Sequence, residues 1–303
     1  MIISVIIPVY NGERHIGSCY QSLCRQTYPD WEAVFINDGS TDRTSELLSN
    51  IGSTDSRVKV IHKNNEGVAV ARERGIAQST GGIITFLDVD DTLADNALRI
   101  FADTFNASGA DIVVSGINLI SEEGALIKSI EYKPESMSGD TATAMLCDGR
   151  LRWQLWAKAF KRGLLTNVVT PAGLRSAEDM AVCLQAVAAA DKVCALGCCL
   201  YNYMQVATSV THAKAQEISM DALSSANFAE KVAGARIGKE NTNCMFMLII
   251  SGALRSGISD PEKIFHNSIS RHFSIASLRR LSFNKAVNVL LFKLFRINLA
   301  KYL

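Results

Sequence analysis

Short runs of β-branched and apolar residues alternate with segments of helical periodicity over the first 120 residues. The runs are apolar on both faces, which is typical of buried strands in a parallel sheet. They predict strands at Ile2–Ile7, Ala33–Ile36, Val58–Ile61, Ile83–Leu87 and Ile112–Val114. The segments between them predict helices at Ile16–Cys24, from Ser40 or Thr41 to Asn50, at Val68–Gln78 and at Ala97–Ala107. This order predicts an α/β fold, in which helices flank a mostly parallel, Rossmann-like sheet.

The pattern changes after about Leu119. Ser121–Ser138 is polar and predicts a loop with a hairpin at Glu123-Gly124. Helices are predicted beyond it at Thr141–Leu146, Ala177–Ala190 and Met220–Lys231. The last 90 or so residues are mostly helical in pattern, so we expect a helical C-terminal extension. We therefore divide the chain into residues 1–118, 119–212 and 213–303.

Charge is spread unevenly along the chain. The totals of 31 Lys and Arg and 30 Asp and Glu are balanced and give no reason to expect a nucleic-acid partner, but Ile264–Leu303 holds seven basic residues and no acidic one. Within this tail, one helix face carries Lys285, Asn288, Lys293 and Arg296, and the other carries Val287, Leu290, Leu291, Leu294 and Phe295. A basic amphipathic helix suits an anionic membrane surface. The alternative is a terminal helix docked on the domain, with its lysines solvated.

Neither a leader nor a membrane-spanning segment is predicted. The apolar start MIISVIIPVY lacks the basic residues and the cleavage site of a signal peptide. The longest later apolar stretch, Cys244–Leu254, is too short to cross a bilayer. The eight cysteines form no CxxC pair, as expected of reduced thiols in a cytosolic protein. We expect a cytoplasmic protein, which the basic tail can hold on the inner face of the cytoplasmic membrane.

Four polar clusters follow the first four predicted strands. They are Pro8-Val9-Tyr10-Asn11, Asn37-Asp38-Gly39-Ser40, Asn64-Asn65-Glu66-Gly67 and Asp88-Val89-Asp90-Asp91. Ligands of open α/β sheets bind beyond the carboxyl ends of the strands, so four such clusters in succession predict a ligand-binding crevice. The chain has no GxGxxG after the first strand and no GxxxxGK[ST], which argues against a dehydrogenase or a P-loop protein.

Two of these clusters carry specific chemistry. Asp38 can accept a hydrogen bond from a base that offers an N–H, such as uracil N3–H, and Gly39 allows close backbone approach ahead of a helix N-terminus. The alternative for this Asp-Gly-Ser-Thr is a plain turn with a helix cap. Asp88, Asp90 and Asp91 place three carboxylates at one strand end, where they would repel one another without a cation. Mg²⁺ and Mn²⁺ prefer such ligands and keep open positions for diphosphate oxygens.

These residues lie in strings that resemble glycosyltransferase family 2, whose members share the GT-A fold. The strings are SVIIPVYN, FINDGSTD, NEGVAVARERGI, GGIITFLDVDD, WAKAFKRGLL and SAEDMAVCL. They run from about Ile3 to Leu184, and YNYMQVATSVTH (Tyr201–His212) resembles the end of the same catalytic domain. The set is specific for the family but not for the sugar. It implies an inverting hexosyl- or N-acetylhexosaminyltransferase that uses a UDP-sugar.

The resemblance implies a role for each matching position. Residues 1–118 would form the nucleotide-sugar-binding half of the domain and residues 119–212 the acceptor-binding half. The donor would be held by Pro8, Tyr10, Asn11, Asp38, Gly39, Asn64, Gly67, Arg72, Asp88 and Val89. Asp90 would bind the divalent metal, Mn²⁺ or Mg²⁺, with Asp91 and His212 as further ligands. The acceptor would lie near Trp156, Lys158 and Glu178, with Asp179 as the general base.

The roles at the acceptor side have structural alternatives. A carboxylate opposite the leaving group can take the proton of the acceptor hydroxyl, and a single displacement of this kind inverts the anomeric carbon. Acidic residues such as Glu178 and Asp179 also occur at helix starts simply because they favour the helix dipole. Likewise, Trp156 can be a core residue and a lone His212 can be structural.

Two departures from the family pattern bear on the reaction. Gly149 stands where processive synthases carry the Gln of a QxxRW motif, ahead of Arg152-Trp153, and this favours a single addition. Tyr201–Gln205 reads YNYMQ, without the arginine that many relatives place after the second tyrosine, so one expected phosphate contact is missing. Membrane contact by the tail would suit a saccharide acceptor linked to polyprenyl diphosphate, or a lipid-linked glycan core, as in the assembly of bacterial surface polysaccharides such as O-antigen, capsule or lipopolysaccharide.

Two other protein classes are alternatives to a glycosyltransferase. A sugar-phosphate nucleotidyltransferase would be expected to open with a glycine-rich, basic loop, whereas this chain has PVYNGER. A non-catalytic carbohydrate-binding protein would not need the acidic set Asp38, Asp88, Asp90 and Asp179.

Overall fold

The computed structural model describes residues 1–171, 177–205, 215–255 and 264–295. They form two compact units, which we treat separately. The first consists of Met1–Ser138, Gln154–Thr170 and Ala190–Val206, and the second of Gly139–Trp153, Pro171–Ala189 and Ala207–Leu303. The predicted boundary at residue 118 falls within a strand of the first unit. The assignment of nucleotide and acceptor roles to the three predicted segments stays a prediction.

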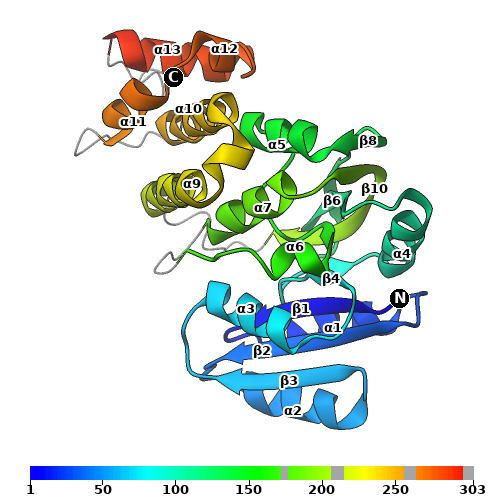
Figure 1. Cartoon of the computed structure of the whole chain (residues 1–303). Coiled ribbons are helices and arrows are strands. Elements are labelled where there is room, and N and C mark those ends of the chain that lie inside the picture. The colour runs from blue at the N-terminus through cyan, green and yellow to red at the C-terminus, as the bar shows by residue number, and fades with distance from the viewer. Residues whose placement is uncertain (172–176, 206–214, 256–263, 296–303) are drawn as a thin grey trace. The chain divides into compact units, whose positions relative to one another are not determined.

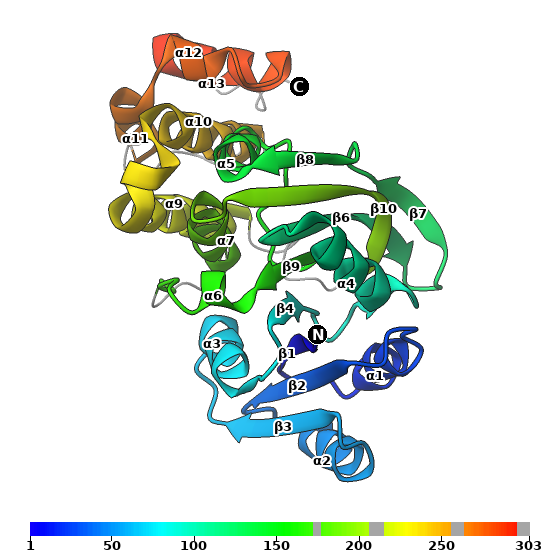
Figure 2. The same ribbon diagram turned by 45° about the vertical axis from the view of Figure 1, so that its right-hand side comes forward.

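The first unit is built on one sheet with the strand order β3-β2-β1-β4-β9-β6-β10-β5 (Figures 1 and 2). Its first four strands are parallel and match the predicted runs: β1 (Ile3–Val9), β2 (Trp31–Asp38), β3 (Val58–Lys63) and β4 (Ile83–Phe86). The strand β1 is buried along its whole length, which explains why its residues are apolar on both faces.

Beyond β4 the sheet is mixed. The strand β6 (Ile112–Ser121) pairs parallel to β10 (Lys192–Gln205), whereas β9 (Lys158–Lys161) runs antiparallel between β4 and β6. The short β5 (Thr92–Leu93) and β8 (Glu135–Ser138) pair antiparallel to β10. The predicted hairpin is confirmed at Gly124, where β7 (Leu126–Ile130) turns back along β6. Sequence patterns missed β7 and β8 because most of their side chains are exposed and lack an apolar face.

Helices cover both faces of this sheet, as predicted. One face packs against α1 (Ile16–Cys24), α2 (Thr44–Thr54) and α4 (Ala97–Ser108), and the other against α3 (Val68–Gln78). Gly75 sets the close approach of α3, because a Cβ there would lie 2.3 Å from a methyl group of Ile6 and 2.8 Å from one of Ile36. The short α6 (Arg162–Leu165) follows β9.

The second unit is helical. Its helices are α5 (Gly139–Asp148), α7 (Glu178–Ala188), α9 (Ala215–Ile237), α10 (Lys239–Arg255), α11 (Ile264–His272), α12 (Ile275–Leu278) and α13 (Phe283–Phe295). The helix α10 contacts α5, α9, α11, α12 and α13, and it buries every residue of Cys244–Ile250, which accounts for the apolar stretch seen in the sequence. In the part of the chain that the structure describes, no helix is long and apolar enough to span a membrane.

The C-terminal helix α13 packs on α10 and α11. It buries Val289 and Phe292, neither of which belongs to the predicted apolar face, and leaves Leu290 of that face 37% exposed. The side chains of Leu291, Leu294 and Phe295 and all of Arg296 lie outside the described residues. The described part of the tail is therefore docked, through a different face from the one the sequence predicted.

Candidate functional site

The four predicted polar clusters lie along one edge of the sheet. The strands β1 to β4 are parallel and adjacent, so their carboxyl ends meet at this edge. Pro8 is buried in β1, and Tyr10 follows the strand with 52% of its surface exposed. The structure therefore brings the predicted donor-binding segments together in the first unit.

Hydrogen bonds join the loops after β1 and β2. The amide of Asn11 donates to the Ser40 hydroxyl (2.9 Å), and the Asn11 side-chain oxygen accepts from the Thr41 amide (2.8 Å). The Gly12 amide donates to the Thr44 hydroxyl (2.8 Å). Asn11 has a φ of 50°, a left-handed conformation that asparagine tolerates. The predicted capping of α2 by Ser40 or Thr41 is wrong, because these residues bond the neighbouring loop and the helix begins later.

Asp38 is buried at the end of β2, and both of its oxygens are hydrogen-bonded. Oδ1 accepts from the ammonium of Lys63 and from the amide of Glu66 (3.0 Å), and Oδ2 accepts from the amide of Gly67 (2.8 Å). Lys63 ends β3 and Gly67 is the N-cap of α3. One carboxylate thus fixes the positions of three elements. The sequence placed Asp38 and Gly67 at the site but missed Lys63, whose partner lies 25 positions away.

Gly39 permits a close contact, but with the protein backbone. Its φ is 72°, and a Cβ at this position would lie 2.6 Å from the amide nitrogen of Asn65. Any other residue would push apart the loops after β2 and β3. The neighbouring Asn64 is exposed, and its carbonyl accepts a hydrogen bond from Lys63 (2.7 Å).

The three aspartates after β4 have different surroundings. Asp88 forms an ion pair with Arg72 of α3 (3.1 Å) and is partly exposed. Asp91 is 1% exposed; its oxygens accept from the Tyr201 hydroxyl (2.5 Å) and from the Met204 amide (2.8 Å). Asp90, between them, is partly exposed and makes no hydrogen bond or ion pair with any described residue. Val89 packs against the core.

The electrostatics of this loop suit a cation. Burial, and then the charges of Asp90 and Asp88, raise the pKa of Asp91 well above its ordinary value, although the Tyr201 hydrogen bond opposes the shift. Negative charge at this strand end is therefore not fully compensated. No group of three acidic, His or Cys side chains converges within the described ranges. The residues fit Mg²⁺ or Mn²⁺ held by Asp90, with or without Asp88, because these ions keep positions for phosphate and water oxygens.

Trp156 and Lys158 are both buried in the first unit. The Trp156 ring stacks on Tyr201 at 4.9 Å and on Tyr203 at 5.4 Å, between ring centroids. Lys158 is 2% exposed, and its ammonium donates to the carbonyl of Gln154 (2.5 Å). The Trp156 ring thus supports Tyr201 of β10, whose hydroxyl bonds Asp91. A contact of either residue with an acceptor stays a prediction.

Glu178 and Asp179 lie in the first turn of α7, in the second unit. The preceding Ala177 is left-handed, with a φ of 59°, and begins the helix sharply. Glu178 is buried and Asp179 is partly exposed. Acidic side chains in the first turn of a helix also interact favourably with the helix dipole, so this position fits a purely structural role as well. His212 lies outside the described residues.

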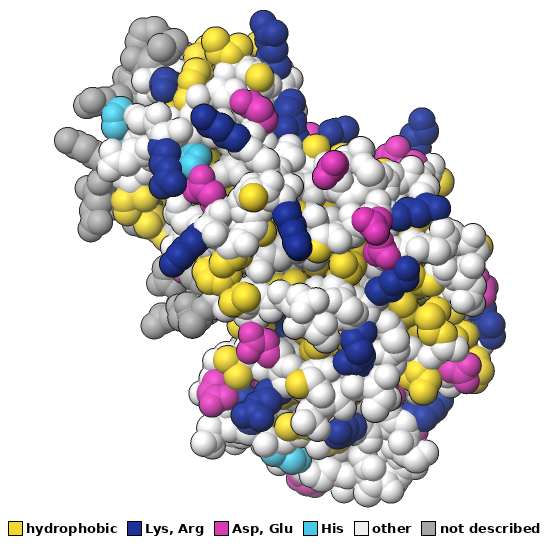
Figure 3. Space-filling view, in the orientation of Figure 1, with side chains coloured by type: hydrophobic (Ala, Val, Ile, Leu, Met, Phe, Trp, Pro, Cys, Tyr) yellow, Lys and Arg dark blue, Asp and Glu magenta, His cyan; other side chains and the backbone are white. Residues whose placement is uncertain are grey.

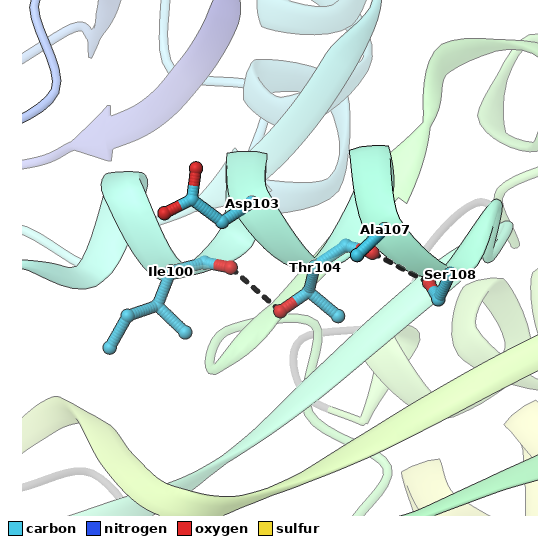
Figure 4. A pocket seen from close by; sticks show the side chains of 5 residues that line it. All are labelled: Ile100, Asp103, Thr104, Ala107 and Ser108. Atoms are coloured by element: carbon cyan, nitrogen blue, oxygen red, sulfur yellow. Dashed lines mark hydrogen bonds between the residues drawn. The ribbon is translucent and has the colours of Figure 1, made fainter.

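A shallow hollow of about 430 Å³ runs along the outer side of α4 (Figure 4). It is lined by Ile100, Asp103, Thr104, Ala107 and Ser108. The hydroxyls of Thr104 and Ser108 donate to carbonyls of their own helix, at 2.7 and 2.6 Å. With its hydroxyls already bonded, the hollow lacks the convergent polar groups of a binding site.

The model of the family named "Glycosyl transferase family 2" matches residues 4–154, which include the four polar clusters at the carboxyl ends of β1 to β4. The chain belongs to this family. It is 31% identical to the uncharacterized glycosyltransferase EpsJ of Bacillus subtilis over 219 residues, which cover 69% of this chain but only 63% of EpsJ. It is 26% identical to TuaG of the same organism, a glycosyltransferase named for teichuronic acid biosynthesis, over 70% of this chain and 82% of TuaG.

Solved structures confirm the fold of this family member. S. aureus TarS 1–349 in complex with UDP-GlcNAc has a TM-score of 0.71 at 19% identity, over 93% of this chain and 82% of that one. The mannosyltransferase PcManGT from Pyrobaculum calidifontis, in complex with GDP-Man and Mn²⁺, has a TM-score of 0.60 at 14% identity. The match covers 97% of this chain and 87% of that one. The predicted α/β fold of GT-A type, with flanking helices and a helical C-terminal region, is thus confirmed.

We predict that Tyr201→Phe destabilises the protein by about 1–3 kcal/mol, because the buried Asp91 carboxylate loses a hydrogen-bond donor. The measurement is the unfolding midpoint in urea or on heating. Tyr203→Phe is the matched control, since Tyr203 also stacks on Trp156 but its hydroxyl bonds no described residue. Equal effects of the two substitutions would show that the Tyr201 hydroxyl does not support Asp91.

Proposed function

We propose that this protein is a metal-dependent, inverting glycosyltransferase that transfers one hexosyl or N-acetylhexosaminyl group from a UDP-sugar to a hydroxyl of a saccharide. The observation that carries the proposal is one sheet edge that holds both the buried Asp38 and Asp90, which bonds no described residue. The complex of TarS with UDP-GlcNAc supports a uridine nucleotide. The Mn²⁺ complex of PcManGT supports a divalent metal.

Each residue of the edge has a part in donor binding. Pro8, Tyr10 and Asp38 hold the nucleobase and ribose, with Asn11 and Gly39 shaping the loops around them. Asn64, Gly67 and Arg72 lie near the ribose and the sugar diphosphate, and the ion pair of Arg72 with Asp88 keeps the guanidinium at the end of β4. Asp90 holds the Mn²⁺ or Mg²⁺, which neutralises the charge that develops on the departing UDP.

At the acceptor side, Asp179 takes the proton of the attacking hydroxyl. Glu178 assists acceptor binding beside it, and His212 and Asp91 remain weaker candidates for metal ligation than Asp90. The relationship to TuaG supports a saccharide acceptor in bacterial polysaccharide synthesis. We propose a lipid-linked acceptor carried on polyprenyl diphosphate. Membership of the family argues against the nucleotidyltransferase, and metal-dependent release of UDP would distinguish transfer from both alternatives.

Asp90→Asn is expected to reduce transfer at least about a hundredfold, because a neutral amide is a poor ligand for Mn²⁺ or Mg²⁺. The unfolding midpoint without metal should stay the same or rise, since one charge that opposes ionisation of Asp91 is removed. UDP release is measured with whichever UDP-sugar supports turnover. Asp103→Asn, in the hollow on α4, is the control and should be active. Unchanged activity of Asp90→Asn, or of the wild type in metal-free buffer, contradicts the proposal.

Asp179→Asn keeps the size of the side chain but removes its basicity, so kcat should fall by roughly 10²–10⁴. The affinity for UDP, measured by calorimetry, should be unchanged. A variant that turns over normally, or that loses affinity for UDP instead, would assign Asp179 to structure.

We also propose that the C-terminal helices contact an anionic membrane surface, where a lipid-linked acceptor would be found. Phe283 is 80% exposed and Ile275 is 63% exposed, in a segment without acidic residues. Hydrophobic and basic side chains lie next to one another over these helices (Figure 3). Exposed apolar side chains beside Lys and Arg are the usual composition of such surfaces.

Full-length protein should sediment with vesicles that contain phosphatidylglycerol, and less so as salt rises, because each Lys or Arg near the surface contributes about 1 kcal/mol. Phe283→Ser should weaken vesicle binding about tenfold, since one large apolar side chain no longer enters the interface. Leu126→Ser is the control, because Leu126 is 61% exposed on β7 of the other unit. Absence of binding at low salt, or an equal loss in both variants, contradicts a membrane surface at these helices.

A further inference from the structure

We infer that Lys63 makes the base pocket selective for uracil over guanine, by occupying a hydrogen-bond acceptor position of Asp38. The inference rests on the proposed function, in which Asp38 reads the nucleobase. It concerns a residue that the sequence patterns did not single out and that holds the carboxylate from the side of β3.

The hydrogen bonds of Asp38 leave it one acceptor position. A carboxylate has about four lone-pair positions, two on each oxygen. The Lys63 ammonium and the Glu66 amide fill both positions of Oδ1, and the Gly67 amide fills one position of Oδ2. Asp38 can therefore accept a single further hydrogen bond, and only at Oδ2.

The bases differ in how many donors they present to a carboxylate. Uracil presents one, N3–H, between two carbonyl groups. Guanine presents two adjacent donors, N1–H and the 2-amino group, which pair with both oxygens of a carboxylate. With Oδ1 filled, the guanine amino group has no acceptor, and an unpaired polar group in a binding pocket reduces affinity. Cytosine presents an acceptor at N3 and is disfavoured with or without Lys63.

Lys63 is held firmly in this position. Its side chain is 9% exposed, and its ammonium also donates to the carbonyl of Asn64 (2.7 Å) and pairs with Glu66 (3.0 Å). The other two donors to Asp38 are backbone amides, which only a substitution by proline would remove. Lys63 is thus the donor that decides whether Oδ1 can receive a second group from the base.

The test compares UDP, GDP and IDP binding to the full chain by calorimetry with Mn²⁺ present. Inosine has the N1–H of guanine and the same ring system but lacks the 2-amino group, so the ratio of GDP to IDP affinity reports on Oδ1 independently of base size. In the wild type, GDP should bind more weakly than IDP, because its amino group is left without an acceptor, and UDP should bind most tightly. In Lys63→Met, GDP should bind about tenfold more tightly than IDP, because its amino group gains an acceptor.

Three other variants sharpen the test. Lys63→Arg keeps a cationic donor and should keep GDP binding weaker than IDP binding, as should Lys59→Met, which removes an exposed lysine of the same strand. Lys63→Leu, which likewise has no N–H donor, gives the same comparison if the Met variant does not fold. A ratio of GDP to IDP affinity that stays at its wild-type value in both the Met and the Leu variant would overturn the inference. Failure of the wild type to prefer UDP over CDP would instead overturn the proposed uridine donor, so the two failures are distinguishable.

Discussion

The buried carboxylate of Asp38 is the contact on which the carboxyl edge of the parallel strands depends. It ends β2, bonds the last residue of β3 through Lys63 and bonds the amide of Gly67 at the start of α3. Because α3 begins at a fixed point, Arg72 is placed on the second turn of this helix, where it reaches Asp88 at the end of β4. A charge buried in this way is tolerated only when it is paired and hydrogen-bonded, and here the partners are themselves parts of the site.

The loop after β4 uses neighbouring aspartates for different purposes. Asp88 is tied to α3, and Asp91 is tied to β10 through Tyr201 and Met204. These two anchors hold the short loop from both sides and leave Asp90 open between them. The stack of Trp156 on Tyr201 extends the support to the segment that precedes β9. The repulsion among the aspartates opposes folding in the absence of a cation, which is the usual relation between a charged functional site and stability.

The sequence predicted the N-terminal half of the fold well, because each helix and strand there has a clear spacing of apolar residues. The helix α3 was predicted to the residue, and β1 to within two residues at its end. It could not reveal the mixed half of the sheet, since short strands such as β5 and exposed ones such as β7 have no apolar pattern of their own. In the same way, the sequence shows three aspartates in a row. It does not show that Asp91 turns inward, because its partner Tyr201 lies 110 positions along the chain.

The hydrogen bonds between the loops after β1 and β2 have a consequence for the kinetics of recognition. These loops bond each other through Asn11, Ser40 and Thr44, so the wall of the nucleotide site that we propose is held together without a nucleotide. A ligand that meets an ordered wall does not have to immobilise loop residues, and little of its interaction energy is lost to conformational entropy. Encounter should then proceed as docking of two rigid bodies, with an association rate set by diffusion and charge and not by a loop-closing step. Nucleotides of different affinity should accordingly have similar association rates and differ in their dissociation rates.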